Sequence, residues 1–267
     1  MKKFTEIASA RHTWAWPYVL FLVLFVVLPL LLIFYYAFTT PGGDFTIQNF
    51  VKFFHTSEAV NTLIYSMAIA FITTVICLVL GYPAAYIMAM AEFKTPQVMA
   101  LLFILPMWIN FLLRTIATVE LFHMFGLPLG EGALLFGMCY DYLPFMIYPI
   151  YNTLQKMDRS LIEAAQDLGA NKTNVFTKVI LPLSVPGIYS GIVMVFMPTV
   201  STFAIAELLT HNKITLFGSL IQRSFGEGGI AMWNYGAALS LIMLIIIAAT
   251  SFFDQERDHD AQKGGLL

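Results

Sequence analysis

The first long apolar run of the chain is PYVLFLVLFVVLPLLLIFYYAF, which occupies residues 17–38. It contains no charged side chain, and about 20 mostly apolar residues are enough for a helix to cross the hydrocarbon core of a bilayer. The run is too long, and too well followed by further apolar runs, to be only a signal peptide. It therefore predicts that the chain is an all-α integral membrane protein.

Five more apolar runs follow, and we place spans near residues 61–90, 97–118, 132–153, 186–208 and 233–253. The run at 61–90 is longer than a perpendicular crossing needs, so we expect it to tilt, to extend beyond the bilayer or to bend at Gly81-Tyr82-Pro83. About six transmembrane helices are thus expected in a membrane domain of residues 17–253. A short segment, residues 1–16, precedes this domain, and a polar tail, residues 254–267, follows it.

The composition agrees with a membrane protein and excludes several other classes. Of the 267 residues, 59% are hydrophobic and 11% are charged, whereas a soluble domain has about 25% charged residues. The net charge of −2 gives no electrostatic reason to bind nucleic acid. Cys77 and Cys139 lie in apolar runs without metal-ligand spacing, and the five histidines are scattered. We therefore expect no metal and no cofactor bound by this chain.

The distribution of positive charge predicts the orientation. With six spans and the N-terminus inside, ten Lys and Arg residues lie in inner segments and three, Lys52, Lys213 and Arg223, in outer ones. Positive residues are enriched on the cytoplasmic side of membrane proteins. Both termini are therefore expected to be cytoplasmic. The inner residues are Lys2, Lys3, Arg11, Lys94, Lys156, Arg159, Lys172, Lys178, Arg257 and Lys263.

The inner loop between the fourth and fifth spans, residues 154–185, is long, polar and patterned. Its core, residues 160–169, reads SLIEAAQDLG. Ser160 and Glu163 have the spacing of a capping box, which predicts that a helix begins at Ser160. Gly169 suits the left-handed position just beyond a helix end.

The predicted loop helix has one small apolar face. A helix of about eight residues is marginal by itself in water, so something must pack on that face. The two alternatives are an interfacial helix lying on lipid and a helix that docks on a cytoplasmic partner, and the small face favours docking. A second short helix, capped by Asn171, is expected to extend to about Lys178, with Pro182 and Pro186 marking the return to the membrane. The apolar face comprises Leu161, Ala164, Ala165 and Leu168.

Several residues of this loop, at set distances from one another, resemble the EAA loop of ABC importer permeases. Runs elsewhere are similar to the first, B-type, permease of spermidine/putrescine importers: LGYPAAY (80–86), LPMWIN (105–110), LPFM (143–146) and WNYGAA (233–238). The resemblance covers roughly residues 17–250. The loop residues that carry it are Glu163, Ala164, Ala165, Gly169, Phe176 and Ile180-Leu181-Pro182.

The resemblance implies a type I ABC importer permease fold in the plasma (inner) membrane of a prokaryote. It implies as partners a second, C-type permease subunit, two copies of a cytoplasmic ABC ATPase and an extracytoplasmic substrate-binding protein, besides membrane lipid. The chain has no GxxxxGK[ST] phosphate loop, so ATP and Mg are expected on the ATPase, and this chain is expected not to be an enzyme. The coupling role implied for the EAA loop falls on Leu161, Glu163, Ala164, Ala165, Asp167, Leu168 and Gly169.

Three ionisable residues, Arg114, Asp141 and Glu207, fall within predicted spans. A charge at the bilayer centre costs about 2.5–3.5 kcal/mol on insertion scales, so such residues are functional candidates. Simpler roles compete with function. Arg114 can pair with Glu120 or with Asp141 to hold helices together, and Glu207 can reach outer water or touch the binding protein.

A pathway for polyamines needs carboxylates and aromatic faces, through ion pairing and cation–π attraction. The binding must also be weak enough for release. A packing role for Trp108 is the simpler alternative. The candidates for the substrate pathway are Trp108, Asn110, Tyr140, Asp141, Tyr148 and Glu207.

Other functions are weighed against this hypothesis. The same machine could carry another small solute, such as an amino acid, an anion or a metal chelate. A membrane-embedded enzyme would need a catalytic constellation, and Asp141 and Glu207 form no recognisable motif. An ion-coupled secondary transporter would not need the EAA loop, and no inverted repeat is visible in the sequence.

Overall fold

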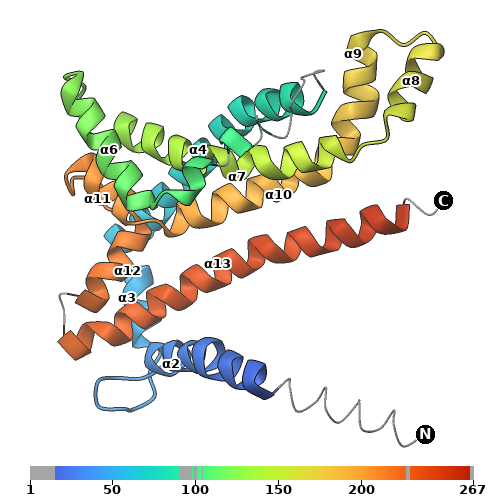
Figure 1. The fold of residues 1–267 in the computed structure, drawn as a ribbon. Helices are drawn as coiled ribbons and strands as arrows, with labels where there is room; N and C mark the ends of the chain where they lie inside the picture. The colour runs from blue at the N-terminus through green and yellow to red at the C-terminus, as the bar shows by residue number, and fades with distance from the viewer. Residues whose placement is uncertain (1–15, 91–97, 99–100, 104, 227–228, 265–267) are drawn as a thin grey trace, which may run out of the picture. The chain divides into compact units, whose positions relative to one another are not determined.

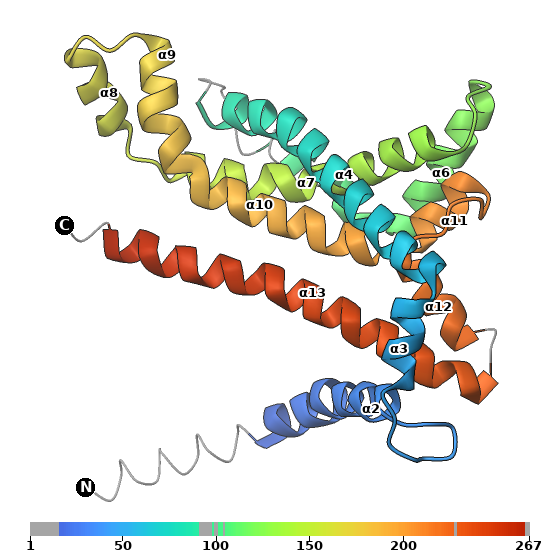
Figure 2. The same cartoon turned by 180° about the vertical axis from the view of Figure 1, so that it is seen from behind.

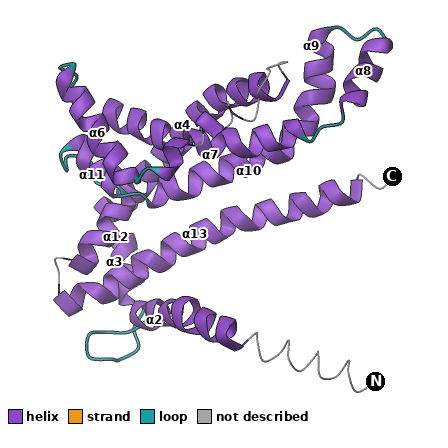
Figure 3. Ribbon diagram, in the orientation of Figure 1, coloured by secondary structure: helices purple, strands orange, loops and turns teal. Residues whose placement is uncertain are grey.

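The computed structural model describes residues 16–90, 98, 101–103, 105–226 and 229–264. Within these ranges Figure 3 shows helices and loops and no strand. Five of the described helices are long and apolar enough to cross a membrane, or six if one sharply bent pair counts as a single span. The expectation of an all-α protein with about six spans is confirmed.

Most spanning helices begin and end close to their predicted limits. The 34-residue α4 shows no interruption at Gly81-Tyr82-Pro83, so Pro83 is accommodated inside a continuous helix. The first span, Trp16–Ala37, contains the π-helical turn η1 (Val23–Val27) and α2 (Leu28–Ala37), and the others are α4 (Ser57–Met90), α7 (Glu131–Gln155) and Met232–Thr250 within α13 (Gly229–Gly264). The shorter helices include α3 (Gln48–His55) and α12 (Phe217–Gly226).

The third predicted span, at residues 97–118, corresponds to a sharply bent pair of helical segments, which is one span only if both segments are counted together. A short 3₁₀ helix, η2 (Leu105–Trp108), is followed by α6 (Phe111–Met124). The helical segment that ends at Trp108 and the one that begins at Phe111 differ in direction by 97°. The Asn110 side chain accepts a hydrogen bond from the Leu112 N–H at 2.8 Å and caps the new helix. This local cap explains why the helix restarts there. Residues 97, 99, 100 and 104 lie outside the described part of the chain.

The prediction for the fifth span, 186–208, is wrong at both ends. A continuous helix runs over Lys172–Ser201, and after an extended Thr202 the short helix α11 (Ala204–Thr210) follows. The expected second loop helix is therefore only the start of this span. Pro182 and Pro186 lie inside this continuous helix instead of marking its start, and the π-helical turn η3 directly precedes the segment that contains them. A π-helical turn changes the backbone hydrogen-bond pattern, which helps a helix to accommodate a residue without an N–H. The long helix consists of α9 (Lys172–Val175), η3 (Phe176–Ile180) and α10 (Leu181–Ser201).

The chain forms two compact units, and the larger contains Glu58–Leu220. Its core is the contact between α7 and α10, which lie side by side in both Figure 1 and Figure 2. A Cβ atom on Gly191 would meet the Met146 sulfur of α7 at 2.7 Å, and one on Gly187 would meet the Thr153 hydroxyl oxygen at 2.5 Å. Helices in lipid approach closely through such small residues. Gly187 and Gly191 therefore set the distance between α7 and α10.

The smaller unit contains α2, α3 and Ile221–Ile245. Its polar centre is Asn234 of α13, which is 2% exposed. The Asn234 side-chain amide donates to the backbone oxygens of Tyr36 at 3.1 Å and Thr39 at 2.7 Å. The Tyr36 oxygen also accepts the Thr39 N–H, and the Thr39 oxygen also accepts the Asn49 side-chain amide, so Asn234 adds a second donor to each. Asn234 thus stabilises the turn that ends α2.

An Asn234→Ala substitution is expected to destabilise the protein by about 1–3 kcal/mol, because it removes two hydrogen bonds to backbone oxygens, each of which contributes about 0.5–1.5 kcal/mol. Thermal unfolding of the purified protein in detergent measures this change. Asn61→Ala is the matched control, since Asn61 is an exposed residue of α4. Equal melting temperatures for the two variants would contradict the assignment.

Candidate functional site

A short helix, α8 (Arg159–Asp167), lies between α7 and the long helix that begins at Lys172. The predicted capping box at Ser160 is wrong, because the N-cap is Asp158, whose carboxylate accepts the Ser160 N–H at 2.9 Å. This backbone hydrogen bond lowers the pKa of Asp158. Gly169 has φ +85°, which confirms its left-handed position. The Asn171 side chain caps the next helix through the Asn174 N–H, as predicted.

The predicted apolar face of α8 is divided between two sides. Ala165 is half-buried and, together with Ile162, packs against the core formed by α4, α7 and α10. Leu161 and Leu168 are 47% and 89% exposed. Ala164 is exposed as well, and so are Glu163, Asp167 and Gly169. One side of α8 therefore holds it to the protein, while the other presents apolar and small side chains with no cover from the described residues.

A cavity of about 430 Å³ lies on the inner side of α8. Glu163 lines this cavity, whereas Ala164 does not. The core side of α8 is completed by Phe176, whose ring packs edge-on against the rings of Tyr82 and Tyr86 of α4. The cavity is lined by Tyr86, Met90, Arg159, Ile162, Glu163, Gln166, Lys172, Val175 and Ile180.

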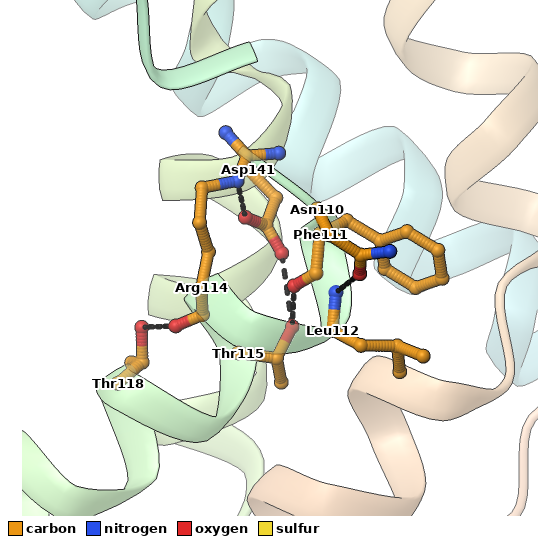
Figure 4. Close-up of polar contacts among 7 residues, drawn as sticks. All are labelled: Asn110, Phe111, Leu112, Arg114, Thr115, Thr118 and Asp141. Carbon is orange, nitrogen blue, oxygen red and sulfur yellow. Dashed lines mark hydrogen bonds and ion pairs between the residues drawn. The ribbon is translucent and has the colours of Figure 1, made fainter. Parts of the chain in front are cut away.

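Arg114 of α6 pairs with Asp141 of α7, as Figure 4 shows. The Arg114 Nε and Asp141 Oδ1 atoms are 3.2 Å apart, and the two side chains are 6% and 2% exposed. The other carboxylate oxygen, Oδ2, accepts a hydrogen bond from the Thr115 hydroxyl at 3.2 Å. Of the alternatives left open by the sequence, the structure therefore selects Asp141 as the partner of Arg114, rather than Glu120.

This ion pair lines a cavity of about 520 Å³. The cavity lies where two helices are interrupted, between η2 and α6 and between α10 and α11. Three of the predicted pathway residues, Trp108, Asn110 and Asp141, line it. Trp108 is 77% exposed, while Asn110 has the structural task of capping α6. The other lining residues are Met107, Ile109, Phe111, Arg114, Tyr142, Phe145, Pro198, Ser201, Thr202, Phe203, Ala204 and Ile205.

The remaining predicted pathway residues do not line this cavity. The Tyr140 ring lies 5.9 Å from the Arg114 guanidinium carbon, at the outer limit of a cation–π contact. Tyr148 lies about two helical turns beyond Asp141 on α7 and is 44% exposed. Glu207 is half-buried on α11. The structure thus brings together the candidates around Asp141 and leaves Tyr148 and Glu207 apart from them.

Sequence reasoning missed Thr115 and Thr202. Thr115 directly follows Arg114 in α6, but its hydrogen bond to Asp141 depends on the packing of α6 against α7. Thr202 is the extended residue that ends α10. The signal for that interruption was Pro198, because a proline close to a helix end weakens the backbone hydrogen bonding there.

The fold is similar to that of solved ABC transporter chains. One is a bacterial ABC transporter involved in the import of the acidic polysaccharide alginate, with a TM-score of 0.72 and 14% identity over 96% of this chain and 99% of that chain. A chain of the MetNI methionine ABC transporter has a TM-score of 0.61 and 18% identity over 74% of this chain and 93% of that chain. At such low identities the likeness establishes the fold.

Two curated relatives are similar along most of the sequence. The spermidine/putrescine transport system permease protein PotB of Escherichia coli K12 is 34% identical over 249 residues, which cover 85% of this chain and 90% of the relative. The PotB of Haemophilus influenzae is 33% identical, with coverage of 86% and 88%. A family model matches residues 81–257. The chain therefore belongs to the family of binding-protein-dependent transport system inner membrane components.

Proposed function

We propose that this chain is the permease subunit of an ATP-driven importer for polyamines such as spermidine and putrescine. The observation that carries the proposal is the similarity to spermidine/putrescine permeases over 85% of the chain. The cavity at Asp141 supports the substrate class, because it combines a buried carboxylate with aromatic side chains. A polyamine offers spaced ammonium groups that such side chains attract.

The outward side of α8 supports a role in coupling to a cytoplasmic ATPase. Leu161, Ala164 and Leu168 are exposed there, and Asp167 and Gly169 are exposed as well, whereas the exposed Glu163 borders the inner cavity. On this proposal, closure of two ATPase subunits moves α8, and α8 moves α7 and the long helix on either side of it. A transition of this kind is a rigid-body movement of packed helices. The pathway itself would be formed with a second permease, and a binding protein would deliver the substrate from outside.

An uptake assay tests the proposed function. The complete complex, with its ATPase and binding protein, is reconstituted in proteoliposomes, and labelled spermidine uptake is measured with ATP on the ATPase side. Unlabelled putrescine is expected to compete, while amino acids, anions and metal chelates are not. Uptake that requires an ion gradient but no ATP would favour a secondary transporter. Competition by an anion or amino acid, without competition by polyamines, would overturn the substrate assignment.

Glu207 provides a separate prediction about the pathway. If its half-buried carboxylate attracts the cationic substrate, Glu207→Gln is expected to reduce spermidine uptake about 10-fold, the effect of losing one charge-assisted contact. The complex should still assemble, because the described residues include no ion pair to Glu207. Glu131→Gln is the matched control on α7. Unchanged uptake in Glu207→Gln would remove Glu207 from the pathway.

A further inference from the structure

The ion pair between Arg114 and Asp141 is incomplete for a pair so deeply buried. It consists of one Nε–Oδ1 approach at 3.2 Å, whereas a strong arginine–carboxylate pair forms two parallel hydrogen bonds. The Arg114 Nε and Nη1 atoms and the Asp141 Oδ1 atom are buried without a well-oriented hydrogen bond. A buried polar group without a hydrogen-bond partner destabilises the state that contains it. Both partners could therefore gain from a different arrangement.

The position of the Arg114–Asp141 pair makes it accessible to a ligand. Arg114 and Asp141 line the 520 Å³ cavity, so a ligand in the cavity can approach them. An unpaired guanidinium nitrogen inside a membrane must face protein or a water-filled space, since lipid tails offer it no acceptor.

We propose that Arg114 is a built-in counter-ion, which pairs with Asp141 when the pathway is empty. An ammonium group of the substrate displaces it from the carboxylate. The inference rests on the proposed polyamine import and adds Arg114 as the residue that sets substrate release. Asp141 would hold the ammonium group, and the guanidinium would compete with it for the same carboxylate. Arg114 thereby weakens substrate binding and speeds release.

Exchange at Asp141 is favourable for two reasons. A lone buried carboxylate would be costly, and Arg114 lowers that cost while the site waits for substrate. The Thr115 hydroxyl remains on Oδ2 whichever cation occupies Oδ1, so the carboxylate keeps its orientation. After displacement, the guanidinium can be stabilised by a cation–π contact with Tyr140, whose ring centre lies 5.9 Å from the guanidinium carbon.

The proposal restricts the substrates that can open the pair. A neutral solute cannot replace a guanidinium on a carboxylate, and an anion would pair with the free Nη1 atom of Arg114 instead. Only a cationic solute, such as one with a protonated amine, competes directly with Arg114. The two charged residues would therefore contribute to selection after the binding protein has released its ligand.

Four variants of the assembled complex test the exchange, with binding of labelled spermidine and its uptake as the measurements. Arg114→Gln is expected to bind spermidine about 10-fold more tightly and to turn over more slowly, because the competitor is gone. Asp141→Asn and the double variant Arg114→Gln/Asp141→Asn are expected to lose binding. A purely structural pair predicts the opposite for the double variant, because neutralising both charges together restores a satisfied interior. Recovery of wild-type binding and uptake in the double variant would overturn the proposal.

Arg114→Lys keeps the test decisive if Arg114→Gln does not assemble. Lysine retains the charge but not the guanidinium geometry, so it should compete less well, and spermidine affinity should lie between those of wild type and Arg114→Gln. An affinity at or below that of wild type would contradict the exchange. Co-purification of the partner subunits reports assembly in every variant. Failure of the wild-type complex to take up spermidine would reject the polyamine function itself, a result distinct from wild-type uptake without the expected Arg114 effect.

Discussion

An Ala164→Arg permease is expected to reach the membrane and to fold, yet to import no substrate. Ala164 is exposed on α8, on the side that faces away from the core, so the arginine displaces no packed side chain among the described residues. If that side docks on the ATPase, the substitution buries an unpaired charge, which costs several kcal/mol. Because about 1.4 kcal/mol corresponds to a tenfold change, docking should weaken by more than about 100-fold. Uptake and ligand-stimulated ATP hydrolysis should fall together.

Thr173→Arg is the matched control for Ala164→Arg. Thr173 is exposed in α9, outside α8, and the substitution introduces the same side chain close by. Membrane abundance and melting temperature are measured for both variants, so that a folding defect is separated from a coupling defect. Normal ligand-stimulated ATP hydrolysis and uptake in Ala164→Arg would remove α8 from the coupling mechanism.

The second large effect is expected from Gly187→Ala, which adds one methyl group between α10 and α7. The added Cβ would lie 2.5 Å from the Thr153 hydroxyl oxygen and 2.9 Å from the Pro149 carbonyl oxygen. The backbone of α7 has to shift, and overpacking of this kind costs about 1–3 kcal/mol. A lower melting temperature and reduced uptake are expected, because α10 ends in the cavity that contains Asp141.

Gly132→Ala is the control, since a Cβ at Gly132 meets nothing within 4 Å. Alanine also has a helix propensity about 1 kcal/mol better than that of glycine, so this variant should be as stable as the wild type or more so. Thermal unfolding in detergent compares the two proteins. Equal stability of Gly187→Ala and Gly132→Ala would mean that α7 and α10 do not pack as the structure has them.

Local features were the ones that sequence reasoning predicted well. The apolar run at 17–38 became the helix Trp16–Ala37, and Gly169 adopted the left-handed conformation expected of it. The N-cap of α8 was misplaced by two residues, because Asp158 and Ser160 are both good capping residues and local sequence does not rank them. The long helix that begins at Lys172 was missed, because prolines were taken as a stop although their position made them compatible with a helix.

The candidate site was only partly predictable. The sequence identified Arg114 and Asp141 as unusual because a charge in a membrane span is costly wherever it lies. Whether Arg114 pairs with Asp141 or with Glu120 was decided by the packing of α6 against α7. The separation of Glu207 from the cavity likewise depended on the interruption at Thr202, which places Glu207 on the separate helix α11. Tyr148 shares the continuous helix α7 with Asp141, and it does not line the cavity.

By itself, the sequence determined that this protein spans the membrane and that a patterned loop helix, residues 160–169, follows the fourth span. Both properties follow from hydropathy and capping, which act over a few residues. Only the tertiary structure decided that Arg114 contacts Asp141 and that Leu161, Ala164 and Leu168 stay exposed while Ala165 is partly covered. These outcomes depend on how closely helices far apart in the sequence approach, and glycines such as Gly187 and Gly191 set that distance.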